Sequence, residues 1–160
     1  MTVESSAPAS GNLAALESLL PPPPHPLGSY VATTQVGNLL YTSGVLPMKD
    51  GKIAYTGALG AWDTTAEMGQ EAAKLSILNA LSLIRHALNG DLSRINRIVK
   101  LTGFVSSASG FYDQPAVING ASNFLIEHFG DAGRHVRSAV GVASLPGNAS
   151  VEIELIVELK

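Results

Sequence analysis

The C-terminal stretch RSAVGVASLPGNASVEIELIVELK, Arg137 to Lys160, constrains the fold of this chain more than any other. Apolar and non-apolar residues alternate on both sides of Leu145–Asn148, and this period of two is typical of half-buried antiparallel strands. The pattern predicts a β-hairpin whose apolar face holds Val140, Val142, Val151, Ile153, Leu155 and Val157. The second face mixes charge with very small side chains, namely Arg137, Ala139, Gly141, Ala143, Glu152, Glu154 and Ile156. Such a face suits the approach of another subunit or a small anion.

The low proportion of charged residues indicates how much of the protein surface is exposed to solvent. Charged residues make up only 14% of the chain and apolar residues 46%, whereas soluble domains usually carry roughly 25% charged residues. This balance predicts a homo-oligomer, in which other subunits cover part of the surface. The length of 160 residues suits one domain. The net charge is −3 and no run of Lys or Arg occurs, so no nucleic-acid partner is expected.

Several kinds of site find no support in the sequence. The chain has no cysteine, which excludes disulfides and thiolate chemistry. The four histidines, His25, His86, His128 and His135, lack metal-ligand spacing, so neither a metal nor a cofactor is expected. No phosphate-binding glycine loop or nucleophilic serine elbow is present. No secretory pattern or membrane-length apolar run occurs, which predicts a cytoplasmic protein without a membrane partner.

The order of the remaining elements predicts an α+β sheet with two helices packed on one face. Strand patterns at 30–35 and 38–43 form a first hairpin, and residues 95–106 form a long strand. A capping box at Thr64–Glu67 begins a helix that ends at Asn89–Gly90, with a buried stripe of Ala73, Ile77, Leu81, Ile84 and Leu88. A second helix begins at Gln114 and ends at Gly130.

The N-terminal part differs in character from the rest. A short amphipathic helix precedes four consecutive prolines, Pro21–Pro24, which form a stiff connector. We therefore expect an N-terminal extension over residues 1–25 and a single domain over residues 26–160.

Arg137 is the most promising candidate for binding. Its planar, permanently charged guanidinium can hold a carboxylate with two parallel hydrogen bonds. An alternative is a salt bridge with Glu154 or Glu158. Glu152 lies too far from Arg137 along the predicted hairpin for a direct pair within one chain. The two residues can cooperate only across a small ligand or a subunit boundary.

Three separated segments resemble one known family. HVRSAVGVASLPGNASVEIELIVE is similar to the C-terminal signature of the Rid family, the reactive imine deaminases also called YjgF-like proteins. GSYVATTQVGNLLYTSGVLP resembles the first hairpin of that family, and Asn119 in AVINGASNF resembles its helical asparagine. The resemblance covers the chain from about Pro26 to its C-terminus.

The resemblance implies a chorismate-mutase-like α+β fold and a homotrimer with clefts between subunits. It further implies hydrolysis of 2-aminoacrylate-type imines to 2-oxo acids and ammonia, without metal or cofactor. Arg137 would bind the carboxylate of the substrate, and Glu152 would orient or deprotonate the attacking water. The substrate-binding residues carried over are Tyr30, Ser43, Gly44, Asn119 and Ala139.

The sequence also departs from the family pattern. His135 replaces the small residue or proline usual two positions before the arginine, and the N-terminal extension is added to the compact form. These features resemble a longer branch of the family. A non-catalytic trimer that binds small carboxylates is therefore an alternative function. Ribonuclease activity is a third, and the net negative charge argues against it.

Overall fold

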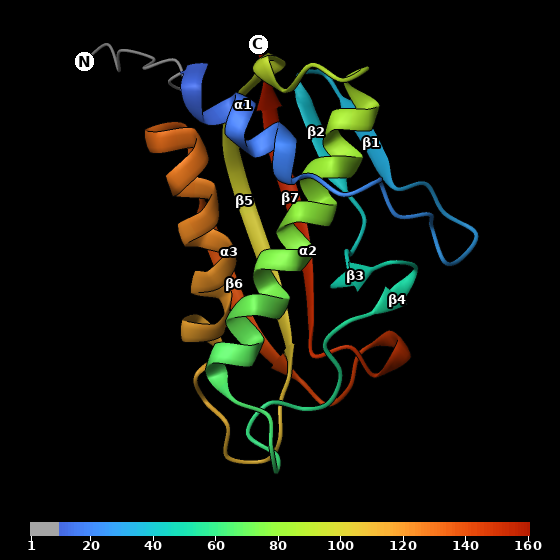
Figure 1. Cartoon of the computed structure of the whole chain (residues 1–160), viewed down its shortest axis with the longest axis vertical. Helices are drawn as coiled ribbons and strands as arrows, with labels where there is room; N and C mark the ends of the chain where they lie inside the picture. The colour runs from blue at the N-terminus through green and yellow to red at the C-terminus, as the bar shows by residue number, and fades with distance from the viewer. Residues whose placement is uncertain (1–9) are drawn as a thin grey trace.

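The computed structural model describes residues 10–160 and contains a five-stranded mixed sheet (Figure 1). The strands stand in the order β1 (Thr33–Val36), β2 (Leu39–Thr42), β7 (Val151–Leu159), β5 (Ile95–Ser106) and β6 (Val136–Val142). A separate pair joins β3 (Met48–Lys49) to β4 (Lys52–Ile53). The helices are α1 (Ser10–Leu19), α2 (Ala66–Ala87) and α3 (Gln114–Phe129), with 3₁₀ turns at Leu92–Arg94, Gly130–Gly133 and Pro146–Asn148.

The predicted C-terminal hairpin is wrong, because β5 lies between β6 and β7. β5 is antiparallel to β7 and parallel to β6. The physical reason is the connection between β5 and β6: a strand, a helix and a second strand form a crossover, which returns the chain parallel to where it began. The alternation in β7 is confirmed, because its residues 151, 153, 155, 157 and 159 are all buried.

The order of the strands also corrects the predicted faces of β6. Arg137 pairs with Leu101, which is buried beneath the helices, whereas Glu152 pairs with Phe104. Since successive residues of β5 point to opposite faces, Arg137 and Glu152 lie on opposite faces of the sheet. Val140 also pairs with Phe104 and is 42% exposed, so its predicted place on the buried face is wrong.

The small residues Ala139 and Gly141 of β6 face α3 and the core. Ala139 packs against the core, and a Cβ at Gly141 would lie 2.7 Å from Nε2 of Gln114 in α3. On β5, a Cβ at Gly103 would collide with Ile118 of the same helix. The smallness of these residues therefore lets α3 lie close to the two strands, where it can reach Arg137.

α2 packs as the sequence predicts, but its N-cap is Thr65, one residue after the predicted Thr64. The hydroxyl oxygen of Thr65 accepts a hydrogen bond from the backbone N–H of Met68 at 3.2 Å, which caps the first turn. The predicted stripe is buried over the sheet. α2 and α3 lie side by side across the same face of the sheet, and α1 packs against α3 (Figure 1).

The first hairpin and the N-terminal segment complete the fold. β1 and β2 pair as predicted, with Val36 opposite Leu39 and Gly37 at φ 60° in the turn. Between α1 and β1, the hydroxyl of Ser82 in α2 donates to the carbonyl of Pro21, which holds the tetraproline against the helix. The predicted extension is described only from residue 10, and its boundary at residue 25 stays a prediction. No helix within residues 10–160 is long and apolar enough to cross a membrane.

Gly120 allows the close packing of α2 and α3, and we expect Gly120→Ala to destabilise the protein. A Cβ at this position would lie 2.8 Å from the backbone Cα of Gln70 and would collide with its carbonyl oxygen. Backbone atoms cannot move aside as a side-chain tip can, so the loss in free energy of unfolding is about 1–3 kcal/mol. Denaturant titration at a fixed protein concentration measures it.

Asn123→Ala on the exposed side of α3 is the matched control, with an expected change within about 0.5 kcal/mol. Equal stabilities of the two variants would contradict the proposed role of Gly120.

Candidate active site

The predicted site residues fall into two groups within one chain. Tyr30, Ser43, Gly44 and Glu152 line a cavity of about 490 Å³, here called the Glu152 pocket. Arg137 and Asn119 lie together beneath the sheet on the side of α3, and with Ser122 and His135 they form what we call the Arg137 cluster. Ala139 lies two residues beyond Arg137 on β6, an edge strand.

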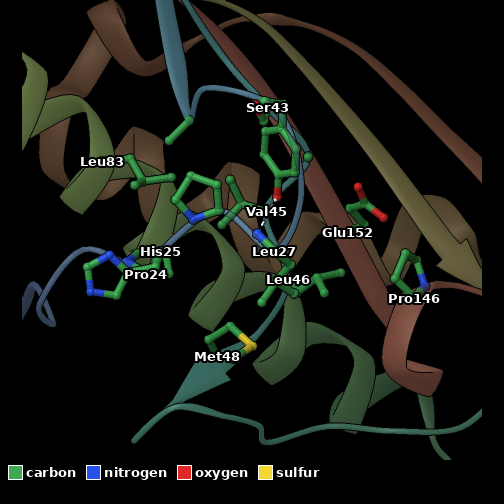
Figure 2. A pocket seen from close by; sticks show the side chains of 14 residues that line it. Pro24, His25, Leu27, Ser43, Val45, Leu46, Met48, Leu83, Pro146 and Glu152 are labelled. Carbon is green, nitrogen blue, oxygen red and sulfur yellow. Dashed lines mark hydrogen bonds between the residues drawn. The ribbon is translucent and has the colours of Figure 1, made fainter.

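The Glu152 pocket is mainly apolar (Figure 2). Its floor includes Val45 and Leu46, which follow β2, and Leu83 of α2, all three buried. The end of the tetraproline and the segment after it add a wall that includes Pro24, His25 and Leu27. The carboxylate of Glu152 is the acidic group of this pocket.

Gly44 and Glu152 are in close contact. A Cβ at Gly44 would lie 2.8 Å from the carboxyl carbon of Glu152 and would collide with its Oε1. Any larger residue would therefore displace the carboxylate. Glycine at position 44 is required by this contact rather than by its backbone angles.

The environment of Glu152 disfavours its charge. Burial, with a smaller contribution from the neighbouring negative charge of Glu154, raises the pKa of the Glu152 carboxyl above its ordinary value. No salt bridge to Glu152 occurs within residues 10–160. A carboxylate with a raised pKa is a stronger base when it is ionised.

Two hydroxyl groups near Glu152 are held by the backbone. Ser43 donates from Oγ to the carbonyl of Val31 at 2.6 Å, so its lone pairs remain available. The phenol oxygen of Tyr30 accepts a hydrogen bond from the N–H of Leu27 at 3.1 Å, and Tyr30 is 49% exposed. The hydroxyl proton of Tyr30 can thus be offered to a ligand.

Arg137 is held by neutral groups of α3. Its Nη1 donates to Oδ1 of Asn119 at 2.7 Å and to Oγ of Ser122 at 3.2 Å. The alternative salt bridge with Glu154 or Glu158 is not formed, and within residues 10–160 the salt bridge present is Arg134–Asp131 at 3.3 Å. The guanidinium therefore keeps its full charge for another anion.

His135 extends the cluster. Its Nε2 lies 3.0 Å from Oγ of Ser122, and its Nδ1 lies 2.7 Å from the carbonyl oxygen of Gly133. Burial lowers the pKa of His135, the nearby charge of Arg137 lowers it further, and the bond to Gly133 opposes both. The imidazole is therefore neutral at physiological pH.

Ser122 is the residue of this cluster that the sequence prediction missed. It lies one helical turn after Asn119, so both side chains project from the same side of α3. The helical spacing between Asn119 and Ser122 was the feature of the sequence that could have pointed to Ser122. Within residues 10–160, no group of three or more His, Asp or Glu side chains is placed to hold a metal ion.

The fold and the two groups of residues define a chorismate-mutase-like α+β protein with a candidate site for small anions. The family described as "YjgF/chorismate_mutase-like, putative endoribonuclease" matches residues 10–159. The chain belongs to this YjgF-like, or Rid, family.

Individual relatives carry different names. Protein TCP17 of Trypanosoma cruzi is 44% identical over 160 residues, with 99% of both chains covered. A 2-iminobutanoate/2-iminopropanoate deaminase of Dermatophagoides farinae is 30% identical, with 86% of this chain and 91% of the relative covered.

Two solved structures show the same fold. The protein Atu1372 of Agrobacterium tumefaciens, of unknown function, is 51% identical, with a TM-score of 0.85 and 94% and 91% of the two chains covered. TdcF of E. coli with bound serine is 26% identical, with a TM-score of 0.63 and 86% and 94% covered.

The raised pKa of Glu152 leads to a prediction on stability. A carboxyl whose pKa is raised by folding stabilises the protein below its unfolded pKa, and this contribution is lost as the pH rises through the folded pKa. We expect Glu152→Gln to raise the melting temperature by roughly 1–3 °C at neutral pH. The gain should disappear near pH 4. Thermal scans at both pH values and one protein concentration measure it.

Glu127→Gln on the exposed side of α3 is the control and should leave both melting temperatures unchanged. A gain for Glu152→Gln that is larger at pH 4 than at neutral pH would contradict the sign of the shift.

Proposed function

We propose that this protein is a homotrimeric imine deaminase that hydrolyses 2-aminoacrylate-type imines to 2-oxo acids and ammonia in clefts between subunits. The observation that carries the proposal is Glu152, a carboxylate of raised pKa in a largely apolar pocket. A general base for water has these properties. Arg137, free of any carboxylate partner within residues 10–160, complements it as an anion anchor.

The chemistry needs one base and one anchor. The carboxylate of the imine binds the guanidinium of Arg137, which holds the C=N carbon in place. Glu152 accepts a proton from water as the water oxygen attacks that carbon and the π electrons move to nitrogen. The nitrogen takes up two protons, the one held by Glu152 and the one on the newly added hydroxyl; the C–N bond breaks, and ammonia leaves as the carbonyl forms. Water and imine are consumed, and 2-oxo acid and ammonia are the products.

The separation of the two groups supports a cleft shared between subunits. Arg137 and Glu152 lie on opposite faces of the sheet in one chain, so they cannot hold one small substrate together. A neighbouring copy can bring its own Arg137 to the Glu152 pocket. The exposed apolar residues Val136, 66% exposed, and Val140 on the open face of the sheet also favour a subunit interface.

The names of the relatives agree with this proposal. One relative is named for the deamination of 2-iminobutanoate and 2-iminopropanoate, and a solved relative holds serine, which carries a carboxylate. The endoribonuclease wording of the family description finds little support here, because the chain has a net charge of −3.

Ammonia release from imines generated in situ by an amino-acid oxidase tests the activity. We expect the protein to accelerate the release and Arg137→Ala to lower kcat/KM by roughly 100-fold or more, because the carboxylate loses a charged, hydrogen-bonded partner. Arg137→Lys keeps the positive charge but lacks the two parallel donors of a guanidinium. Its kcat/KM should lie between those of the wild type and Arg137→Ala. Equal rates with and without protein would contradict the activity.

Mixing two inactive variants tests the shared cleft. Subunits carrying Arg137→Ala and subunits carrying Glu152→Gln are unfolded and refolded together. If each cleft takes Arg137 from one subunit and Glu152 from the next, random assembly gives about one quarter of the clefts both native residues, and activity returns to about that fraction. Each variant refolded alone is the control. If activity does not return in verified mixed trimers, the proposed cleft with Arg137 from one subunit and Glu152 from the next is wrong.

A non-catalytic trimer that binds small carboxylates is the second candidate. It is favoured by the Arg137 cluster, in which Asn119 and Ser122 hold Nη1 of Arg137 without any contribution from Glu152. This alternative predicts carboxylate binding that requires Arg137, together with imine hydrolysis no faster than in buffer. Calorimetry and the ammonia assay on the same preparation distinguish the two functions.

A further inference from the structure

The hydrogen atoms of the Arg137 cluster can be assigned from its geometry. The carbonyl oxygen of Gly133 can only accept, so Nδ1 of His135, at 2.7 Å, carries a proton. In a neutral imidazole Nε2 then has a lone pair. At 3.0 Å from Nε2, the hydroxyl of Ser122 is therefore the donor of that bond.

This assignment fixes the direction of the next hydrogen bond. With its proton directed to His135, Oγ of Ser122 presents lone pairs to Nη1 of Arg137 at 3.2 Å. The second proton of Nη1 goes to Oδ1 of Asn119 at 2.7 Å. Both protons of Nη1 are thus used. Within residues 10–160, the donors without a partner are Nε–H and the two protons of Nη2, and Nε–H with the Nη2 proton beside it forms one edge of the guanidinium.

We propose that His135 is a positioning residue for carboxylate binding: it accepts the proton of Ser122 and thereby fixes Arg137 with its Nε/Nη2 edge open to the ligand. That edge offers two parallel donors, which match the two oxygens of a carboxylate. This role rests on the proposed function, in which Arg137 binds the carboxylate of the substrate. The proposal gives a role to the residue that departs from the family pattern.

The pair of Ser122 and His135 also has the form of an activated serine, and its surroundings argue against that role. Ser122 is only 8% exposed, and its lone pairs are directed to Arg137. A nucleophile needs those electrons and access to the substrate. The pair therefore orients Arg137.

Calorimetry with 2-oxobutanoate, a product-like carboxylate, tests the proposal on the full-length protein. His135→Ala removes the acceptor of the Ser122 proton and should weaken binding about tenfold, because the Ser122 hydroxyl is no longer held with its lone pairs toward the charged guanidinium. His135→Gln places an oxygen near the position of Nε2 and should bind within about threefold of the wild type. His86→Ala on the exposed end of α2 is the matched control and should bind as the wild type does.

A second measurement covers the case in which His135→Ala does not fold. Nitrogen-15 NMR of the histidine rings should show the Nδ1–H tautomer for His135 in the wild type. Ser122→Ala should weaken 2-oxobutanoate binding to the same extent as His135→Ala, and the double variant should be no weaker than either one.

The outcomes separate this proposal from the function on which it rests. If Arg137→Ala abolishes binding while His135→Ala and Ser122→Ala bind as the wild type does, only the role of His135 is overturned. The same conclusion follows from an Nε2–H tautomer, from His135→Gln binding as weakly as His135→Ala, or from labelling of Ser122 by a fluorophosphonate. If the wild type does not bind 2-oxobutanoate, or Arg137→Ala leaves binding unchanged, the anchor itself is wrong.

Discussion

The pairing of β5 with both β6 and β7 decides where every candidate group lies. β5 runs parallel to β6 and antiparallel to β7, and its alternating residues distribute the side chains of both neighbours between two faces. Arg137 pairs with Leu101 and therefore lies on the face covered by the helices. Glu152 pairs with Phe104 and therefore lies on the open face. A direct ion pair within one chain is thereby prevented. Such a pair would neutralise Arg137, the proposed anchor, and lower the pKa of Glu152, the proposed base.

The two groups of residues differ in the way that their proposed tasks require. Arg137 is surrounded by neutral acceptors, Asn119 and Ser122, which orient it without cancelling its charge. Glu152 lies against the backbone at Gly44, in surroundings that disfavour its ionised form. One group thus offers a fixed positive charge and the other a proton acceptor. In the proposed trimer, Arg137 and Glu152 would come together from two subunits, and the ligand rather than the protein would neutralise Arg137.

The sequence predicted those parts of the fold that depend on local pattern. The start of α2 to within one residue, its buried stripe and the alternation of β7 follow from residues a few positions apart. The neighbours of β6 do not follow from alternation, because a period of two defines faces and leaves strand order open. The order of elements held the information on strand pairing. A strand over 95–106, a helix and a strand over 136–142 form a crossover, and a crossover favours parallel neighbouring strands.

The candidate site was predictable to the same limited degree. The chemistry of its side chain singled out Arg137 and the family resemblance added Glu152, whereas Ser122 has no local signal beyond its helical spacing from Asn119. Its role emerges only when α3 lies close to β6, and Gly103, Ala139 and Gly141 make that approach possible. The sequence predicted that Ala139 and Gly141 lie on a face open to another subunit or a small anion, and the structure shows α3 against these two residues. The same small side chains, turned toward α3, bring Asn119 and Ser122 within hydrogen-bond distance of Arg137, so the packing of one helix sets the orientation of the anchor.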